Sequence, residues 1–385
     1  MSRKICVVIT ARPSYSRIKT ALEAMRDHPD IELQLVVTAS ALLERYGDAI
    51  KVIREEGFTV DRQVYMILEG ESPVTSAKST GLGVTELATV FDDLKPDMVV
   101  TIADRFETMA TAIAAAYMNI PLVHIQGGEV TGSIDEKVRH AITKLADIHL
   151  VSSQNSAERV IRMGEDPEKV IVTGCPSIDL ARRARDAEPR AITDVLSGYG
   201  GVGADLDLDK GYIVVLQHPV TTEYQEAADQ ISHTLDAVRA GGYQALWLWP
   251  NVDAGSDATS KTIRSYRELY AMRHVHFYRN FKPLDFLSIL MNSKGIVGNS
   301  SVAIRECSWL GVPAVNIGSR QSRRDRGRNV IDVAHDRDEI QAAIEKCISG
   351  VDRSGDEIYG DGTGGQQIAE ALARVTPTFH KILSY

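Results

Sequence analysis

The chain has 385 residues, 44% of them hydrophobic, and a formal net charge of −9 at pH 7. This length exceeds what one ordinary hydrophobic core supports, so we expect two domains. The acidic charge argues against a broad electrostatic surface for nucleic acid or an anionic membrane, and any bound phosphate must be recognised locally. No apolar run approaches the roughly 20 residues of a membrane-spanning helix. We therefore expect neither nucleic acid nor membrane as a partner.

The N-terminus and the cysteines indicate a cytoplasmic protein. The first apolar run resembles a secretory signal only superficially, because Thr10, Arg12 and Ser14 interrupt it, and we interpret it as a first strand. The cysteines are Cys6, Cys175, Cys307 and Cys347. They lack the CxxC spacing of a zinc site and form no dense disulfide framework, so the cysteines suggest neither.

The first half of the chain alternates predicted strands and helices, which is the pattern of a doubly wound α/β domain. The predicted strands are residues 4–10, 31–38, 97–103, 122–125, 147–152 and 169–173, and the predicted helices include residues 14–26 and 108–117. Residues 181–210 combine arginines and glycines without apolar periodicity, and we predict a linker or a mobile loop there.

A second α/β unit follows this predicted linker. Its predicted strands are residues 212–216, 245–249, 295–298 and 313–317, and its predicted helices are residues 223–240 and 302–310. The fold class is therefore α/β with two Rossmann-like, doubly wound domains. We predict a closing helix from Gln366 to Val375.

Residues 121–140 carry the densest set of candidate catalytic groups. A buried strand is followed by a glycine-bearing loop and by a helix that Ser133 and Glu136 are expected to cap. Ligands of parallel α/β sheets bind at this edge of the sheet. Glu129 lies in the loop, where a carboxylate has no helix to cap, and Asp135 is a better catalytic candidate than the capping Glu136.

The same helix contains two pairs at i,i+4 spacing, Asp135 with Arg139 and Glu136 with His140, and we expect both pairs to form on one helix face. His124 lies inside an apolar strand, and we interpret it as a core histidine with a hydrogen-bond partner.

Two other strand ends of the first half carry charged residues. The loop after the first strand lacks GxGxxG spacing, which counts against a nicotinamide cofactor, but its Arg12 is placed to clamp a diphosphate beside a helix N-terminus. The alternative for Arg12 is a surface arginine. Ser16 of the same loop is a further candidate. Asp104 suits acid/base chemistry and Arg105 suits phosphate binding, while the alternative for Asp104 is an ordinary helix N-cap.

The second half places polar groups at equivalent positions. His218 ends a strand, and Pro219 fixes the turn after it. Ser300 and Ser301 precede a predicted helix and could bind an anion with their hydroxyl and amide groups.

Further candidates of the second half are Asn251, in a strand-to-helix loop, Glu306, which could reach ribose hydroxyls, and Arg320, the arginine of a basic run that lies nearest its strand. We expect most of that basic run to be a solvated loop.

Four sequence blocks together resemble the hydrolysing UDP-N-acetylglucosamine 2-epimerases, a family that includes bacterial enzymes of sialic acid synthesis. The blocks are Gly-Glu-Val-Thr-Gly-Ser-Ile-Asp-Glu from Gly128, Gln-His-Pro-Val-Thr-Thr from Gln217, Pro-Asn-x-Asp-Ala-Gly-Ser from Pro250 and Gly-Asn-Ser-Ser from Gly298. The resemblance implies the GT-B fold with a cleft between its domains, no metal, no nicotinamide or other cofactor, and a homodimer or homotetramer.

The same resemblance implies which part of the chain forms each domain and what each domain does. Residues 1–180 would form the domain with most catalytic carboxylates, residues 181–365 would bind the nucleotide, and a helix at about residues 366–385 would pack back on the first domain. By match, Asp104 and Asp135 are acid/base groups and His218 stabilises or protonates the leaving phosphate. The diphosphate would be held by Arg12, Arg105, Ser300 and Ser301, with Glu306 on the ribose.

The implied reaction converts UDP-N-acetylglucosamine to UDP and N-acetylmannosamine through a 2-acetamidoglucal. One departure bears on the substrate: sialic-acid members of the family usually carry a glutamate where this chain has Gln126. Either Glu129 or Glu136 replaces it, or the substrate differs. Related enzymes that act on UDP- or GDP-linked 2,4-diacetamido-trideoxy sugars in legionaminic acid pathways also vary at this position.

Other functions remain open at this point. A non-hydrolysing 2-epimerase would use the same fold and keep UDP attached to the sugar. A GT-B glycosyltransferase would leave the carboxylates of residues 129–136 without a task. A nucleotide-sugar sensor would bind its ligand without turnover, and only Gln126 favours it.

Overall fold

The computed structural model describes residues 2–44, 48–69, 72–102, 105–131, 135–220, 222–250, 255–270, 272–350 and 352–384. The chain divides into two compact units. The first contains residues 1–129, 134–179 and 360–385, and the second contains residues 130–133 and 180–359. Among the described residues, no helix is both long and apolar enough to cross a membrane.

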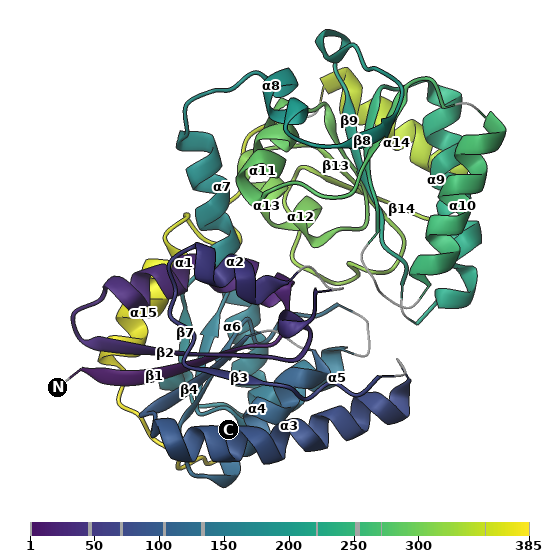
Figure 1. The fold of residues 1–385 in the computed structure, drawn as a ribbon. Coiled ribbons are helices and arrows are strands. Elements are labelled where there is room, and N and C mark those ends of the chain that lie inside the picture. The colour runs from purple at the N-terminus through teal and green to yellow at the C-terminus, as the bar shows by residue number, and fades with distance from the viewer. Residues whose placement is uncertain are drawn as a thin grey trace. The chain divides into compact units, whose positions relative to one another are not determined.

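The first unit is a parallel sheet with helices on both faces (Figure 1). Its elements are β1 (Arg3–Ile9), α1 (Arg12–Asp27), β2 (Ile31–Thr38), η1 (Ala39–Leu42), α2 (Ala49–Glu55), β3 (Arg62–Val64), α3 (Pro73–Leu94), β4 (Met98–Ile102), α4 (Phe106–Tyr117), β5 (Leu122–Ile125), α5 (Asp135–Leu145), β6 (Ile148–Val151), α6 (Gln154–Arg162), η3 (Pro167–Lys169), β7 (Val170–Val172), the start of α7 (Pro176–Asp186) and α15 (Gly364–Arg374). The strand order is β3-β2-β1-β4-β5-β6-β7, and all described pairings are parallel.

The second unit repeats this architecture. Its elements after α7 are α8 (Ile192–Ser197), β8 (Gly201–Gly203), η4 (Leu208–Lys210), β9 (Ile213–Leu216), η5 (Tyr224–Glu226), α9 (Ala227–Gly241), β10 (Ala245–Leu248), α10 (Ser256–Tyr270), β11 (Val275–Tyr278), α11 (Pro283–Asn292), β12 (Gly295–Gly298), α12 (Ser301–Ile304), α13 (Glu306–Leu310), β13 (Ala314–Ile317), β14 (Val330–Val333) and α14 (Arg337–Gly350). The order is β14-β13-β12-β9-β10-β11-β8, and β8 runs antiparallel to β11.

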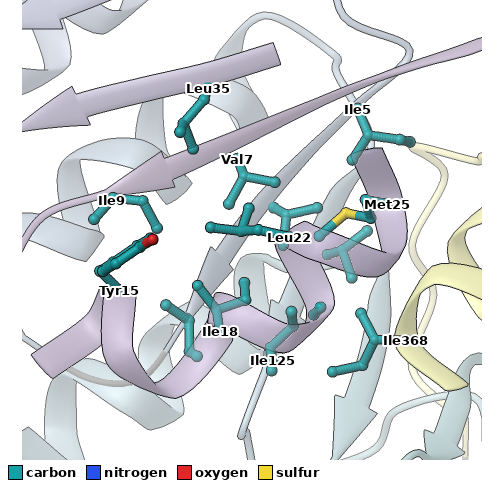
Figure 2. Packing of buried hydrophobic residues seen from close by; sticks show 14 of the residues in the cluster. Ile5, Val7, Ile9, Tyr15, Ile18, Leu22, Met25, Leu35, Ile125 and Ile368 are labelled. Atoms are coloured by element: carbon teal, nitrogen blue, oxygen red, sulfur yellow. The ribbon is translucent and has the colours of Figure 1, made fainter. Parts of the chain in front are cut away.

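Alternation along β1 explains why helices cover both faces of the first sheet. Ile5, Val7 and Ile9 point to one face, where they pack with α1, α2 and α15 (Figure 2). Cys6 and Val8 point to the other face and pack with α3, α4 and α5. A strand buried on both faces is typical of doubly wound parallel sheets, and it is the reason for the continuous apolar runs in the sequence.

In the second unit, the residues of β9 divide in the same way between two helical layers. Ile213 and Val215 pack with α9, α10 and α14. Val214 and Leu216 pack with α7, α8, α11, α12 and α13. The predicted α/β class with two doubly wound sheets is therefore confirmed.

The prediction of a linker or mobile loop over residues 181–210 was wrong. This segment contains the end of α7, all of α8, the short strand β8 and the 3-10 turn η4. The glycines that suggested a loop are needed because β8 lies close against β11: a Cβ on Gly201 would lie 2.4 Å from His276 Nε2, and one on Gly203 would lie 2.4 Å from the Val275 carbonyl oxygen. Glycine therefore marks a close backbone approach here.

Helix α15 packs beside α1 in the first unit (Figure 1). The Asp179 carboxylate caps its start and accepts from the amides of Gly364 (2.8 Å) and Gly365 (2.7 Å). The helix predicted from Gln366 to Val375 is confirmed, whereas the longer helix at about residues 366–385 that the resemblance implies is wrong, because α15 ends at Arg374 and residues 375–384 are not helical. Pro377 is the physical reason, since proline disfavours helical backbone at the residue before it.

Candidate active site

In the first sheet, the strand order reverses direction between β1 and β4, which are neighbours. Such a switch point is where open α/β sheets bind ligands. Arg12 is the first residue of α1 and follows β1, and Arg105 follows β4 at the N-cap position of α4. Asp104 lies outside the described residues. Two of the predicted phosphate-binding arginines are thus placed at the carboxyl ends of adjacent strands.

Arg105 and Ser16, two candidate phosphate-binding residues at this edge of the first sheet, make different contacts. Arg105 Nε lies 3.3 Å from Glu107 Oε2, and Glu107 is only 1% exposed, so a buried carboxylate orients this guanidinium. The Ser16 hydroxyl donates to the Arg12 carbonyl (3.2 Å) in the first turn of α1. It is therefore engaged by its own helix.

The glycine loop after β5 is held by two arginines. Arg139 of α5, which is 1% exposed, donates from Nη1 to the Glu129 carbonyl (2.8 Å). Arg159 of α6 donates to the Gly128 carbonyl (3.2 Å). Gly128 has a φ of +74°, and a Cβ there would lie 2.3 Å from the Ser156 carbonyl oxygen, so this position requires glycine. The loop that carries the buried Glu129 is consequently fixed from two helices.

Gln126 is 2% exposed and has a φ of +65°. Its amide Nε2 donates to Cys175 Sγ (3.2 Å), and that sulfur lies 3.1 Å from the Ser177 hydroxyl. Glutamine does not act as an acid or base, and this side chain contacts Cys175 in the connection between β7 and α7.

Helix α5 begins at Asp135, whose side chain lies outside the described residues, as does Ser133 of the expected capping box. The predicted pair of Glu136 and His140 is confirmed, with 3.3 Å between Oε1 and Nε2. The interpretation of His124 is also confirmed: it is fully buried, and its Nδ1 lies 3.1 Å from the Thr143 hydroxyl.

The second sheet reverses its strand order between β9 and β12, which are also neighbours. His218 follows β9 and is 5% exposed. Burial lowers the pKa of its imidazole well below the usual 6.5, and the positive charge of Arg320 lowers that pKa further. His218 is therefore neutral at pH 7 and can donate a hydrogen bond without carrying a charge.

Asn299 follows β12 and binds both backbone groups of His218. Its Oδ1 accepts from the His218 amide (2.7 Å), and its Nδ2 donates to the His218 carbonyl (2.8 Å). The Asn299 carbonyl in turn accepts from Arg320 Nη1 (3.2 Å) and Gln321 Nε2 (2.9 Å). The sequence analysis singled out Arg320 but did not predict the hydrogen bonds of Asn299 with His218 or of Gln321 with Asn299. Each of these bonds joins segments that are distant in the sequence.

The predicted single helix over residues 302–310 was wrong. Residues 301–310 form two short helices, α12 and α13, which meet at Arg305. Arg305 is 2% exposed, and its φ of −100° and ψ of −74° interrupt the helix. Ser300 caps α12, accepting from the Val302 amide (3.5 Å), and Ser301 is its first residue. Because α12 has four residues, little helix dipole is available for an anion there.

Glu306 opens α13, and in the part of the chain that the structure describes its Oε2 is buried without a hydrogen-bond partner. In the basic run, Arg323 and Arg328 are exposed, as expected for most of it, whereas Arg324 is only 8% exposed. Asn251 lies outside the described residues.

Residues 2–44 and the other described ranges contain no group of three or more His, Cys, Asp or Glu side chains suited to a metal ion.

Comparison with known proteins identifies the family. Residues 23–373 match the family model described as UDP-N-acetylglucosamine 2-epimerase. The UDP-N,N'-diacetylbacillosamine 2-epimerase (hydrolyzing) of Legionella pneumophila is 33% identical, over 100% of this chain and 99% of its own length. The UDP-N-acetylglucosamine 2-epimerase of Neisseria meningitidis is 29% identical, over 97% of this chain and 95% of its own.

A crystal structure of UDP-GlcNAc 2-epimerase from Neisseria meningitidis, bound to UDP-GlcNAc, aligns with a TM-score of 0.79 and 18% identity, covering 97% of this chain and 100% of that one. This similarity concerns the fold, and it confirms the predicted GT-B architecture. The chain belongs to the UDP-N-acetylglucosamine 2-epimerase family.

Proposed function

We propose that the protein is a hydrolysing 2-epimerase of a UDP-linked 2-acetamido sugar. Family membership along nearly the whole chain, with a full-length relative named as hydrolysing, is the observation that carries this proposal. The placement of the candidate residues supports it, because charged and hydrogen-bonding groups follow the strands at the switch point of each sheet.

The proposed reaction has two steps. A carboxylate removes the proton from C2 of the sugar while the bond between C1 and the diphosphate oxygen breaks, which releases UDP and leaves a 2-acetamidoglucal. Water then adds its hydroxyl to C1, and an acid returns a proton to C2 from the opposite face. The proton at C2 is weakly acidic, so a positioned base and a stabilised leaving group are both needed.

We assign the acid and base roles to the carboxylates of the first unit, namely Asp104, Glu129, Asp135 and Glu136. Gln126 cannot serve as an acid or a base, and its contact with Cys175 supports a structural role at that position. The diphosphate would be held by Arg12, Arg105, Ser300, Ser301 and Arg320, with Ser16 and Asn251 as secondary contacts. His218 is neutral, so it would donate a hydrogen bond to the leaving phosphate, and the Glu306 oxygen that has no partner among the described residues would accept one from the ribose.

Two substrates have specific support. The full-length relative with 33% identity is named for UDP-N,N'-diacetylbacillosamine, which favours a diacetamido sugar. The Neisseria meningitidis relative is named for UDP-N-acetylglucosamine, and a structure with the same fold holds that compound. The family resemblance of the sequence blocks favours UDP-N-acetylglucosamine, but we propose the diacetamido sugar first because the relative named for it is 33% identical, against 29% for the other.

An NMR time course in deuterated water tests the proposal. Each nucleotide sugar is supplied separately, with a GDP-linked diacetamido sugar in a third tube. We expect free UDP together with a 2-epimerised sugar that carries deuterium at C2. An epimerised sugar still attached to UDP would contradict hydrolysis, and no turnover of any substrate would contradict the proposed enzyme. The ratio of the two UDP-sugar rates assigns the substrate.

A further inference from the structure

We infer that Asn299 is a positioning residue for His218: its side-chain amide fixes the backbone that carries the imidazole. The effect on turnover rests on the proposed function, while the geometry stands on the contacts within the second unit.

The parallel ladder between β9 and β12 ends just before His218. Its last pair is Leu216 with Gly298, and the Asn299 amide then donates to the Leu216 carbonyl (3.2 Å). Gly298 has a φ of +138°, and a Cβ there would lie 2.0 Å from that carbonyl oxygen, so this position requires glycine. Pro219 has no N–H and cannot continue the ladder.

His218 would therefore have two buried backbone groups without strand partners. Buried amides and carbonyls that lack hydrogen bonds are costly, so a substitute is required. The Asn299 side chain, which is fully buried, supplies an acceptor at 2.7 Å for the His218 amide and a donor at 2.8 Å for its carbonyl. A carboxamide can present an N–H and its C=O toward one side, as the N–H and C=O of a single strand residue do. The Asn299 side chain thus extends the ladder by one residue.

The neighbours of this pair are also fixed. The Gln217 side chain lies on the side of the sheet that α9 covers, where its Oε1 accepts from the buried Thr234 hydroxyl of α9 (2.6 Å). Arg320 and Gln321, which follow β13, donate to the Asn299 carbonyl. The ends of β9, β12 and β13 are therefore joined through Asn299, and His218 has little freedom to shift.

A double-mutant cycle tests the inference. We compare Asn299→Leu, which keeps the number and branching of the side-chain heavy atoms and removes both hydrogen bonds, with His218→Ala and with the double variant. We expect Asn299→Leu to lower kcat about 100-fold with little change in KM, because a shift near 1 Å in a reacting group costs about that much. In the His218→Ala background the same substitution should leave kcat unchanged, although it still lowers the melting temperature.

Asn316→Leu is the matched control. Asn316 is a buried asparagine of β13 (1% exposed) whose side chain donates to Asp332 Oδ1 (2.7 Å). It should lose comparable thermal stability and keep kcat within about twofold, as expected for a residue outside the site. Equal losses of kcat from Asn299→Leu in both backgrounds would overturn the inference, because they would show a general structural effect.

A second measurement does not depend on turnover. With ¹⁵N-labelled histidine, the ring signals of His218 are identified by their absence in His218→Ala. We expect Asn299→Leu to move these signals and their titration toward those of a solvated histidine, and Asn316→Leu to leave them in place. Unchanged signals would overturn the inference even in an inactive protein. A wild-type enzyme that turns over no nucleotide sugar would instead contradict the proposed function alone.

Discussion

At the start of α13, the Glu306 carboxylate has an oxygen that is buried and lacks a partner among the residues that the structure describes. A buried acceptor of this kind is costly unless a ligand completes it. We predict that Glu306→Gln raises the Kd for UDP about 10–100-fold, the range expected for losing a hydrogen bond to a charged group. Isothermal titration calorimetry with UDP measures this directly.

Glu345→Gln provides the control for this prediction, since Glu345 is an exposed glutamate of α14 whose carboxylate bonds Tyr243 and Gln341. It should leave the Kd for UDP unchanged. An unaltered Kd in Glu306→Gln as well would remove Glu306 from the proposed nucleotide site.

Residue identity predicted some local contacts and missed others. The pair of Glu136 and His140 follows from helical spacing, and the buried state of His124 follows from its apolar strand. The arginines that hold the loop of Glu129 could not be predicted in the same way. Arg139 and Arg159 reach it from 10 and 31 residues away, and the distance is closed only when α5 and α6 pack on the sheet.

At the scale of elements, the segment after α15 fastens the end of α5. Lys381 Nζ donates to the carbonyls of Thr143 (3.1 Å) and Ala146 and to Glu165 Oε2 (2.5 Å). Glu165 is 3% exposed and also accepts from Lys144 and His149. Burial by itself would raise the pKa of Glu165, but these hydrogen bonds outweigh it and hold the pKa at about 2.

We predict that Lys381→Met lowers the free energy of unfolding by about 1–3 kcal/mol at pH 7, because it removes one charged donor from a buried carboxylate. The folded-state pKa of Glu165 lies below the ordinary 4.5, so its stabilising contribution is complete above pH 4.5 and is lost as the pH falls toward 2. The difference between wild type and variant should therefore shrink over that range. Urea unfolding from pH 7 to pH 3 measures it.

The exposed Lys346 of α14 offers the control, since Lys346→Met should change the unfolding free energy by less than about 0.5 kcal/mol at every pH. A wild-type to Lys381→Met difference that stays constant between pH 7 and pH 3 would contradict the linkage through Glu165.

At the scale of the whole molecule, the C-terminal residues 360–385 belong to the first unit. Ile368 of α15 is fully buried and belongs to the same core cluster as Leu22 and Met25 of α1 (Figure 2). We predict that Ile368→Ala destabilises the first unit by about 2–5 kcal/mol, the usual result of a cavity in a well-packed core. Hydrogen exchange resolved by mass spectrometry should show faster exchange in residues 135–179 and no change in residues 222–350.

Ile348 of α14 is the matched position in the second unit, because it is the same residue type but 36% exposed. Ile348→Ala should leave exchange in both units nearly unchanged. Faster exchange across both units in Ile368→Ala would show that they unfold together and would contradict this prediction.

Sequence by itself determined the α/β class and the order of most strands and helices, because apolar periodicity and the residues that end each strand are local properties. It also placed His218, Arg12 and Arg105 after their strands, since a strand end is visible in the chain. Only the tertiary structure decided which strand ends are neighbours, and hence that Asn299 binds His218 across 81 residues. It likewise decided that Gly201 and Gly203, which lie in the segment predicted to be a linker or loop, belong to the edge strand β8. Those outcomes depend on close approach between distant segments, which no local pattern encodes.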